Sequence, residues 1–321
     1  SAFLLSTLLI NRLRKFSQSH NLLIPKGIPL VGGIGLGSSF ILVSLFSFFV
    51  HTVYRIPPKE AAGIIASSGI MLIFGIIDDW YELSIWAKFL VQIIATSMLL
   101  LFGVRTQIVY IGNILNMIVT FIWVLGITNA FNHLDVMDGV ASGTALIVGA
   151  AFFALSILNA DARSAILSLV LIGAVSGFFL YNRPPAKVYL GNSGSHFLGF
   201  ILAAIALIIS YAPLERKIAL LSPLLILGLP IFDTTFLVLI RLINKNVPFK
   251  KSNDHLALRF LSLGYSKKRA LLIMLGLCLF FCSSGIIVSL LSNPWGISTI
   301  AIAALVSLAV SVKMSRTVVN G

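Results

Sequence analysis

Long apolar segments recur along the whole chain and constrain its fold more than any other feature. Hydrocarbon accepts helices of about 20 apolar residues, because every backbone polar group must be satisfied within the segment. We therefore predict an all-α, polytopic integral membrane protein with about 10–11 transmembrane helices, built as a single domain over residues 1–321. The apolar segments cover roughly 2–16, 33–50, 61–77, 86–104, 114–130, 140–158, 164–181, 194–212, 217–242, 269–292 and 296–312.

Composition supports a membrane protein and argues against a nucleic-acid partner. Only 10% of the residues are charged, whereas a soluble domain has about 25%. The net charge of +13 could indicate nucleic-acid binding, but the basic residues lie between apolar segments, where they act as topology signals and phosphate contacts. Cys278 and Cys282 lie within one apolar segment, so we expect small core residues and no disulfide or metal site.

The first apolar segment is expected to be a transmembrane helix. It reads SAFLLSTLLI and is followed by Arg12, Arg14 and Lys15. A secretory signal peptide has its positive region before the apolar stretch, so the order of charge and apolar residues here favours a retained helix.

The basic residues are distributed unevenly between the two sides of the membrane. If the segments alternate in direction, 17 of the 23 Lys and Arg residues lie on one side, and the positive-inside rule makes that side cytoplasmic. Seven of the ten acidic residues lie there too, beside apolar helix ends. We therefore predict a metal and phosphate site at the cytoplasmic surface, whereas a transporter would place its acids mid-span. The loops on this side are 11–32, 78–88, 129–139, 182–193, 243–269 and the C-terminal tail.

The first motif is PKGIPLVGGIGLG at residues 25–37. Its glycines allow backbone N–H groups to approach a ligand closely, and Lys26 provides a point charge suited to phosphate. A turn followed by a glycine-rich helix-packing surface is the structural alternative.

The second motif is GIIDDWYELSIWAKFLVQ at residues 75–92. Asp78 and Asp79 end an apolar helix, and two adjacent carboxylates there need a compensating cation such as Mg²⁺. Lys88 and Gln92 are four residues apart and are expected to face the same site. A solvated loop is the alternative.

The third motif, NAFNHLDVMDGV at residues 129–140, places amides and carboxylates at three-residue spacing. Asn129, Asn132, Asp135 and Asp138 are predicted to align along one side of a helical turn and to suit Mg²⁺ and ribose hydroxyls. Capping of a helix end is the alternative, and His133 is expected to be structural.

The fourth motif is YNRPPAKVYLGNSGSHFLGF at residues 181–200. Small residues opening a helix predict a phosphate seat at its N-terminus. In the structural alternative, Asn192 is the N-cap and Ser193 and Ser195 bond locally. The role of His196 is left open.

The fifth motif joins LPIFDTTFLVLIRL to KNVPFKKSNDHLALRFLSLGYS, residues 229–266. Pro230 before Asp233 is typical of a discontinuous helix that lines a polar cavity. The following loop gathers basic residues, Asp254 and His255, and its alternative interpretation is a positive-inside flank.

Taken together, the five motifs resemble those of the polyprenyl-phosphate N-acetylhexosamine-1-phosphate transferases. This superfamily, glycosyltransferase family 4, includes the muramoyl-pentapeptide phosphotransferase of peptidoglycan synthesis and several GlcNAc-1-phosphate transferases. The Asp-Asp pair with Lys-x-x-x-Gln, the NAxNxxDxxDG run and the GxSGSxxLGF run are specific jointly. The resemblance covers nearly the whole chain.

The resemblance implies a reaction, its partners and a set of site residues. A UDP-N-acetylhexosamine and a polyprenyl phosphate, undecaprenyl phosphate in bacteria, would yield a lipid-linked diphosphate sugar and UMP, with Mg²⁺ as cofactor. This is the first membrane step of cell-envelope polysaccharide assembly at the cytoplasmic membrane, and a homodimer is an open option. The implied catalytic residues are Asp78, Asp79, Lys88 and His255. The implied substrate-binding residues are Lys26, Asn132, Asp135, Asp138, Asn182, Tyr189 and Lys251. The implied metal ligands are Asn132, Asn192 and Asp79.

Two positions depart from the family pattern. Asn192 stands where the family has an aspartate that binds Mg²⁺, so metal affinity should fall. Only His255 remains where relatives have a run of histidines, which argues against the muramoyl-pentapeptide branch. A flippase or transporter of lipid-linked intermediates, or a catalytically impaired relative, is therefore the alternative to an active enzyme.

Overall fold

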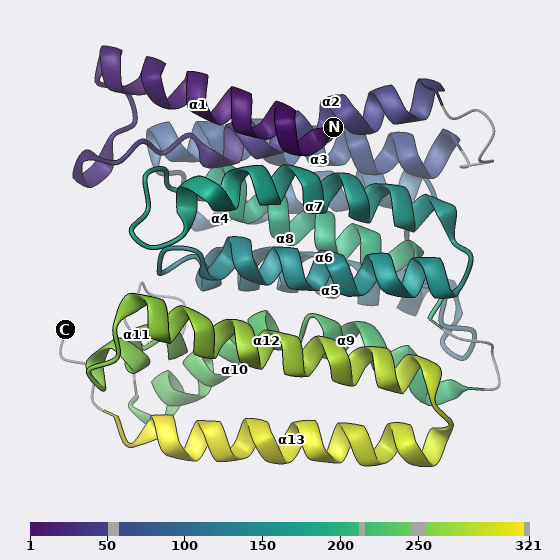
Figure 1. Cartoon of the computed structure of the whole chain (residues 1–321). Helices are drawn as coiled ribbons and strands as arrows, with labels where there is room; N and C mark the ends of the chain where they lie inside the picture. Colours follow the sequence, from purple (N-terminus) through teal and green to yellow (C-terminus); the bar gives the residue numbers. More distant parts are fainter. Residues whose placement is uncertain (51–57, 212–215, 246–253, 318–321) are drawn as a thin grey trace.

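The computed structural model describes residues 1–50, 58–211, 216–245 and 254–317, and every regular element in these ranges is a helix (Figure 1). The predicted all-α class is confirmed. In chain order the α-helices are α1 (Ala2–His20), α2 (Gly32–Val50), α3 (Pro58–Tyr81), α4 (Ile85–Leu101), α5 (Gly112–Leu134), α6 (Val140–Leu158), α7 (Ala162–Asn182), α8 (Gly191–Ile208), α9 (Ser222–Ile226), α10 (Gly228–Ile243), α11 (Leu256–Ser262), α12 (Lys267–Leu290) and α13 (Asn293–Ser315). Two short 3₁₀ helices, η1 (Pro25–Gly27) and η2 (Lys217–Leu221), complete the set.

The helices are those of a multi-pass membrane protein. Within the described ranges, seven helices are long and apolar enough to cross a membrane: α3, α5, α6, α7, α8, α12 and α13. The number is eight if the bent pair of η2–α9 and α10 is one span, and the shorter apolar helices lie at 32–47 and 85–101. All eleven apolar segments of the sequence therefore coincide with helices, although α1 is charged in its second half.

The predicted span at 217–242 is not one straight helix. It bends by 73° between Ile226 and Gly228. The cause is Pro230, which lacks an N–H and whose ring would clash with the carbonyl of Ile226 in a continuous helix. Asp233 follows in α10, as expected for a discontinuous helix.

Helix α8 forms the centre of the bundle, and α13 lies at its edge. The membrane window of α8 is 83% buried, against 11% for α13, and α8 packs against α2, α3 and α5. Glycines permit these close contacts, as is typical of helices in membranes. A Cβ on Gly75 of α3 would lie 2.4 Å from the Cα of Ser193, and one on Gly199 would lie 2.7 Å from the Cα of Thr128.

The loops assigned to one side of the membrane lie at one end of the bundle. The α1–α2, α3–α4, α5–α6 and α7–α8 connections are at the left in Figure 1, together with α11 and the end of α13. This common end therefore brings together motifs that are separated by more than 200 residues of sequence.

Cys278 and Cys282 lie near the middle of α12 and are buried free thiols, which confirms their expected place in the core.

Candidate active site

A buried ion pair joins the last turn of α3 to the first turn of α4. Asp78 is fully buried, and its Oδ2 accepts a hydrogen bond from Lys88 Nζ at 2.6 Å. Its Oδ1 accepts from the backbone N–H of Leu83 at 2.8 Å. A short turn makes this possible: Glu82 adopts a left-handed φ of 42°, and the Ser84 side chain caps α4. The two residues that the sequence placed in one motif are therefore in direct contact.

Gln92 pairs with Asn129, whereas Lys88 pairs with Asp78. Its Oε1 accepts from Asn129 Nδ2 at 2.8 Å, and its Nε2 donates to Asn129 Oδ1 at 3.3 Å. This reciprocal amide pair ties α4 to α5 near the site. Asn129 also donates to the carbonyl of Leu125, one turn back along α5. The described contacts of Gln92 and Asn129 therefore hold α4 against α5.

The polar row at 129–138 is only partly helical, which corrects the predicted alignment. Asn129 and Asn132 lie on α5, but the helix ends at Leu134 and Asp135 is its C-cap. Asp138 lies in the turn before α6, where Gly139 has a φ of +81°. The positive φ of Gly139 helps to turn the chain, so Asp135 and Asp138 lie in the turn between α5 and α6 and not along one face of a helix.

Asp79 caps the N-terminus of the central helix α8. Its Oδ1 accepts from the N–H of Asn192 at 2.7 Å, and its Oδ2 accepts from the N–H of Ser193 at 3.0 Å. A carboxylate is favoured there because the first N–H groups of a helix have no partner within the helix and bear partial positive charge. Gly191 permits the approach: with φ +76°, its missing Cβ would lie 2.7 Å from Asp79 Oδ2. The amides predicted to seat a phosphate therefore hold Asp79.

The side chain of Asn192 faces α5 and does not cap its own helix. The N-cap position of α8 is Leu190, which corrects the structural alternative for Asn192. Asn132 Nδ2 donates to Asn192 Oδ1 at 3.2 Å and to Ser195 Oγ at 2.9 Å. Two of the predicted metal ligands, Asn132 and Asn192, are thus adjacent, and Asp79 bonds to the backbone of Asn192.

The turn between α5 and α6 carries two carboxyl groups. Withdrawal from water raises the pKa of Asp135 to about 7, and the negative charges of Asp79 and Asp138 add to this effect. Asp138 Oδ2 accepts from the N–H of Ala186 at 3.3 Å and from Lys267 Nζ at 3.5 Å. Burial is the larger cause of the raised pKa, and the neighbouring carboxylates near the start of α8 add to it.

Asn182 is a buried structural link at the C-terminal end of α7. Its Oδ1 accepts from the N–H of Gly139 at 3.0 Å and from Ser142 Oγ at 2.7 Å, and its Nδ2 donates to the carbonyl of Val188 at 3.1 Å. These contacts connect the start of α6 to the end of α7. Tyr189 is half-buried, and its backbone N–H donates to the carbonyl of Pro29 at 2.9 Å. The proposed uracil contacts of Asn182 and Tyr189 stay predictions.

The glycine-rich motif at 25–37 acts mainly in packing. The N–H of Gly32 donates to the carbonyl of Tyr189, and that of Gly33 to the carbonyl of Leu190. A Cβ on Gly33 would lie 2.1 Å from the N atom of Gly194. The glycine N–H groups are therefore paired within the protein, as in the structural alternative. Lys26 is exposed in η1, at the same end of the bundle, with a left-handed φ of 53°.

A second buried carboxylate orients the remaining catalytic candidate. Asp233 on α10 is buried, and its Oδ2 lies 2.9 Å from His255 Nδ1, while its Oδ1 accepts from the N–H of Leu256 at 2.9 Å. The ring of His133 lies edge-on, with its centroid 6.2 Å from that of His255. The spacing of the fifth motif placed both residues near a cavity but did not predict their pairing. Lys251 lies outside the described residues.

Two buried residues near this end of the bundle had no role assigned from the sequence. Arg259 bonds to the Asp254 carboxylate at 2.9 Å and to the carbonyl of Met314 at 2.9 Å, which ties α11 to the end of α13. His196 is fully buried on α8, with Nε2 at 4.0 Å from Asp78 Oδ2. The contacts with Met314 and Asp78 have no signal in local spacing, because these partners lie on other helices, whereas Asp254 is only five residues from Arg259.

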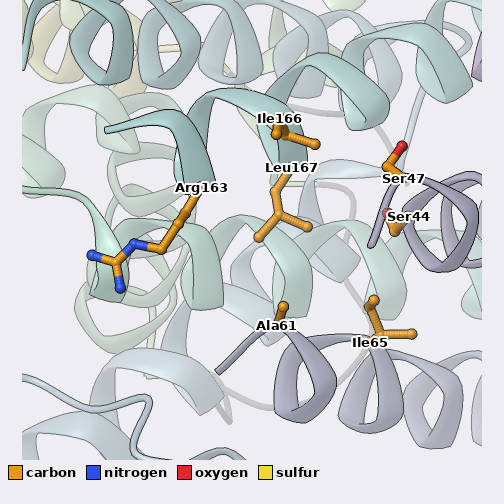
Figure 2. Close-up of a pocket in the computed structure, with 7 residues that line it drawn as sticks. All are labelled: Ser44, Ser47, Ala61, Ile65, Arg163, Ile166 and Leu167. Carbon is orange, nitrogen blue, oxygen red and sulfur yellow. The ribbon is translucent and has the colours of Figure 1, made fainter. Parts of the chain in front are cut away.

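The pocket drawn in Figure 2 is not part of this site. It lies between the second half of α2 and the first turns of α3 and α7, and Arg163 at its edge pairs with Glu60 at 2.6 Å. Ile65 in the pocket and Asp78 are 13 residues apart on α3, or about 20 Å along a helix. The pocket therefore opens toward the opposite end of the bundle. It is lined by Ser44, Ser47, Ala61, Ile65, Arg163, Ile166 and Leu167.

The donor set near α8 suits a magnesium ion that is held only partly by protein. Across the described ranges, no three His, Cys, Asp or Glu side chains converge to enclose a metal. Mg²⁺, however, usually keeps several waters and binds one or two carboxylates together with substrate phosphates. Asp79, Asn132 and Asn192 offer oxygens of the right kind, and a cation would offset the negative charges of Asp79 and Asp138 that contribute to the raised pKa of Asp135.

Comparison with known proteins places these residues in a family context. The family described as glycosyl transferase family 4 matches residues 61–210, which include Asp78, Lys88 and Asn192 but not Lys26 or His255. A probable undecaprenyl-phosphate N-acetylglucosaminyl 1-phosphate transferase of Bacillus subtilis is 29% identical, over 82% of this chain and 74% of the relative. A decaprenyl-phosphate N-acetylglucosaminephosphotransferase of Mycolicibacterium smegmatis is 30% identical, over 77% and 68%. A phospho-N-acetylmuramoyl-pentapeptide-transferase of Streptococcus thermophilus is 30% identical, over 56% and 58%.

Proposed function

The chain belongs to glycosyl transferase family 4, the polyprenyl-phosphate N-acetylhexosamine-1-phosphate transferases, and from that premise we propose its reaction. The protein transfers an N-acetylhexosamine 1-phosphate from a UDP-sugar to a polyprenyl phosphate and releases UMP. The observation that carries the proposal is the Lys88–Asp78 pair. Asp78 is adjacent to Asp79 at the end of α3, and Asp79 accepts from the first residues of α8. This arrangement joins a phosphate-binding cation to a set of oxygen ligands at the surface of a membrane bundle.

The two substrates reach such a site from different directions. A polyprenyl tail is insoluble in water, so the acceptor approaches laterally within the bilayer, while the nucleotide sugar arrives from the aqueous side. Two of the similar relatives are named for undecaprenyl or decaprenyl phosphate and for N-acetylglucosamine. We therefore take undecaprenyl phosphate and UDP-N-acetylglucosamine as the first pair to test.

The reaction forms one P–O bond and breaks another. An oxygen of the lipid phosphate attacks the sugar-bearing phosphorus of the UDP-sugar, and the bond to the α-phosphate breaks so that UMP leaves with the bonding electrons. Such transfers depend mainly on alignment and charge neutralisation. Lys88 is 25% exposed and binds a phosphate group, while the buried Asp78 positions it. Asp79, Asn132 and Asn192 would hold Mg²⁺, which would further neutralise the charge of the diphosphate.

A transporter fits the positions of the charges less well. Asp78 lies in the last turn of α3, and Asp135 and Asp138 lie beyond the end of α5, so these carboxyls are at the bundle end. Transporters bind substrates and coupling ions near the bilayer midplane, at breaks within helices.

A catalytically impaired relative is favoured by one observation, the amide–amide contact of Asn132 with Asn192 at the metal-ligand position.

Turnover of defined substrates tests the proposal. Purified protein, undecaprenyl phosphate, UDP-N-acetylglucosamine and Mg²⁺ should release UMP and form a lipid-linked diphosphate sugar. Lys88→Met should reduce the rate by at least about 100-fold, because a charge-assisted phosphate contact is lost. Lys187→Met is the matched control, since Lys187 is exposed at the same end of the bundle and has no assigned role. Absence of UMP with every UDP-N-acetylhexosamine would refute the enzymatic function.

The membrane side of the site can be tested separately. The cytoplasmic location proposed here rests on the 17-to-6 distribution of basic residues. Both native thiols are buried, at 0% and 2% exposure, so single introduced cysteines give little background. In intact cells, Lys187→Cys should resist an impermeant thiol reagent while Lys59→Cys reacts. Labelling of Lys187→Cys alone would place the site outside.

A further inference from the structure

His196 is a buried histidine whose hydrogen-bonding groups have no partner. The residue is fully buried in the second turn of α8. In the part of the chain that the structure describes, neither ring nitrogen makes a hydrogen bond. A buried polar group without a partner is costly, and such groups are uncommon in native structures. The position of His196 therefore calls for an explanation beyond packing.

The imidazole lies next to the buried carboxylate of the candidate site. Nε2 of His196 is 4.0 Å from Asp78 Oδ2, the same oxygen that accepts from Lys88 Nζ at 2.6 Å. The ring of Phe74, one helical turn before Asp78 on α3, lies 5.6 Å from the His196 ring between centroids. The charged and titratable groups that face the imidazole are Asp78 on α3, Lys88 on α4 and His133 on α5.

Asp78 and Lys88 differ in their freedom to leave the ion pair. The Lys88 side chain is 25% exposed and flexible, whereas Asp78 is fully buried. A phosphate group that recruits the ammonium of Lys88 would leave the carboxylate with only the N–H of Leu83. A buried charge that loses its partner is strongly destabilising, so binding through Lys88 alone would be opposed.

We propose that His196 is a second partner of Asp78, which replaces Lys88 when the lipid phosphate binds. A neutral imidazole with its proton on Nε2 can donate to Oδ2 once that oxygen is released by the lysine. The gap of 4.0 Å exceeds a hydrogen bond, for which about 2.7–3.2 Å is usual, so a shift of about 1 Å closes it. His196 is thus a positioning residue, and this role rests on the proposed function, with the lipid phosphate as the phosphate group that Lys88 binds.

The test compares lipid-phosphate binding with nucleotide binding in two variants. Farnesyl phosphate serves as a short polyprenyl monophosphate, and UDP-N-acetylglucosamine with Mg²⁺ serves as the second ligand. His196→Leu should weaken farnesyl phosphate binding by roughly 10- to 100-fold, the effect of losing one hydrogen bond to a charged group. It should change the affinity for the nucleotide sugar by less than about twofold. His196→Gln keeps an N–H donor and should stay within a few-fold of the parent for both ligands.

The possible outcomes separate this inference from a structural role and from the proposed function. Equal loss of both ligands, or a lowered melting temperature in both variants with unchanged selectivity, would show a packing role and overturn the inference. Parent-like binding of farnesyl phosphate by His196→Leu would overturn it while UMP release by the parent still supports the enzyme. If His196→Leu selectively loses farnesyl phosphate binding while the parent protein releases no UMP, the inference is supported and the proposed reaction is refuted. If His196→Leu does not fold, His196→Met makes the same comparison.

Discussion

The ion pair between Asp78 and Lys88 predicts an unequal response to removal of either partner. Lys88→Met leaves a carboxylate that is fully buried, with one remaining donor, the N–H of Leu83. Asp78→Asn instead leaves an ammonium that is 25% exposed and can extend into water. The lysine variant should therefore be much less stable than the aspartate variant, although both remove the same contact.

The expected magnitudes follow from these exposures. Removing one partner of a buried pair costs about 3–5 kcal/mol, so we expect a loss in that range for Lys88→Met. If His196 moves to Asp78 in this variant, the loss should lie near the lower end. Asp78→Asn should cost only about 1 kcal/mol, the usual net value of a hydrogen bond. At about 2 °C per kcal/mol, the melting temperatures should fall by about 6–10 °C and about 2 °C.

Thermal unfolding in detergent and UMP release provide the two measurements. The double variant Asp78→Asn, Lys88→Met should regain most of the melting temperature, because it has no buried unpaired charge, and should remain inactive. Such a result would separate the functional need for the pair from its structural cost. Equal destabilisation by the two single variants, or a double variant no more stable than Lys88→Met, would refute the reasoning.

Three further predictions concern the metal ligands and the packing of α8. Asn192→Asp should raise Mg²⁺ affinity and the rate of UMP release by roughly tenfold, because a carboxylate binds Mg²⁺ more strongly than an amide oxygen, and an unchanged or lower rate contradicts this. Gly75→Ala should destabilise the protein by about 1–3 kcal/mol, since its Cβ would lie 2.4 Å from the Cα of Ser193. Gly69→Ala on the same helix has nothing within 4 Å and should be neutral or stabilise by up to about 1 kcal/mol. Protonation of Asp135, whose pKa is raised to about 7, removes a negative charge near the proposed metal ligands. The affinity for Mg²⁺ should therefore be lower below pH 7 than above it, and thermal shift with Mg²⁺ should show this pH dependence vanish in Asp135→Asn.

Local sequence features were sufficient for the fold class and for one part of the site. Each long apolar segment is helical, with a break in the segment at 217–242, because an apolar stretch in hydrocarbon must satisfy its own backbone polar groups. Alternation of these segments placed all the polar motifs at one end of the bundle (Figure 1). The sequence also placed Asp78 and Lys88 in one motif, and a short turn between two helices brings these residues, ten apart, into contact.

Only the tertiary structure decided which partners the other polar groups have. Asp79 caps a helix by accepting from Asn192, 113 residues later in the sequence, and His196 on that helix lies beside Asp78. These contacts require α3 and α8 to approach closely, which Gly75 permits by omitting a side chain. Sequence spacing describes neighbours along one helix, whereas a contact between helices depends on how several packed surfaces fit at once. The chain's own residues therefore predicted the chemistry of the site, and the packing around α8 determined its geometry.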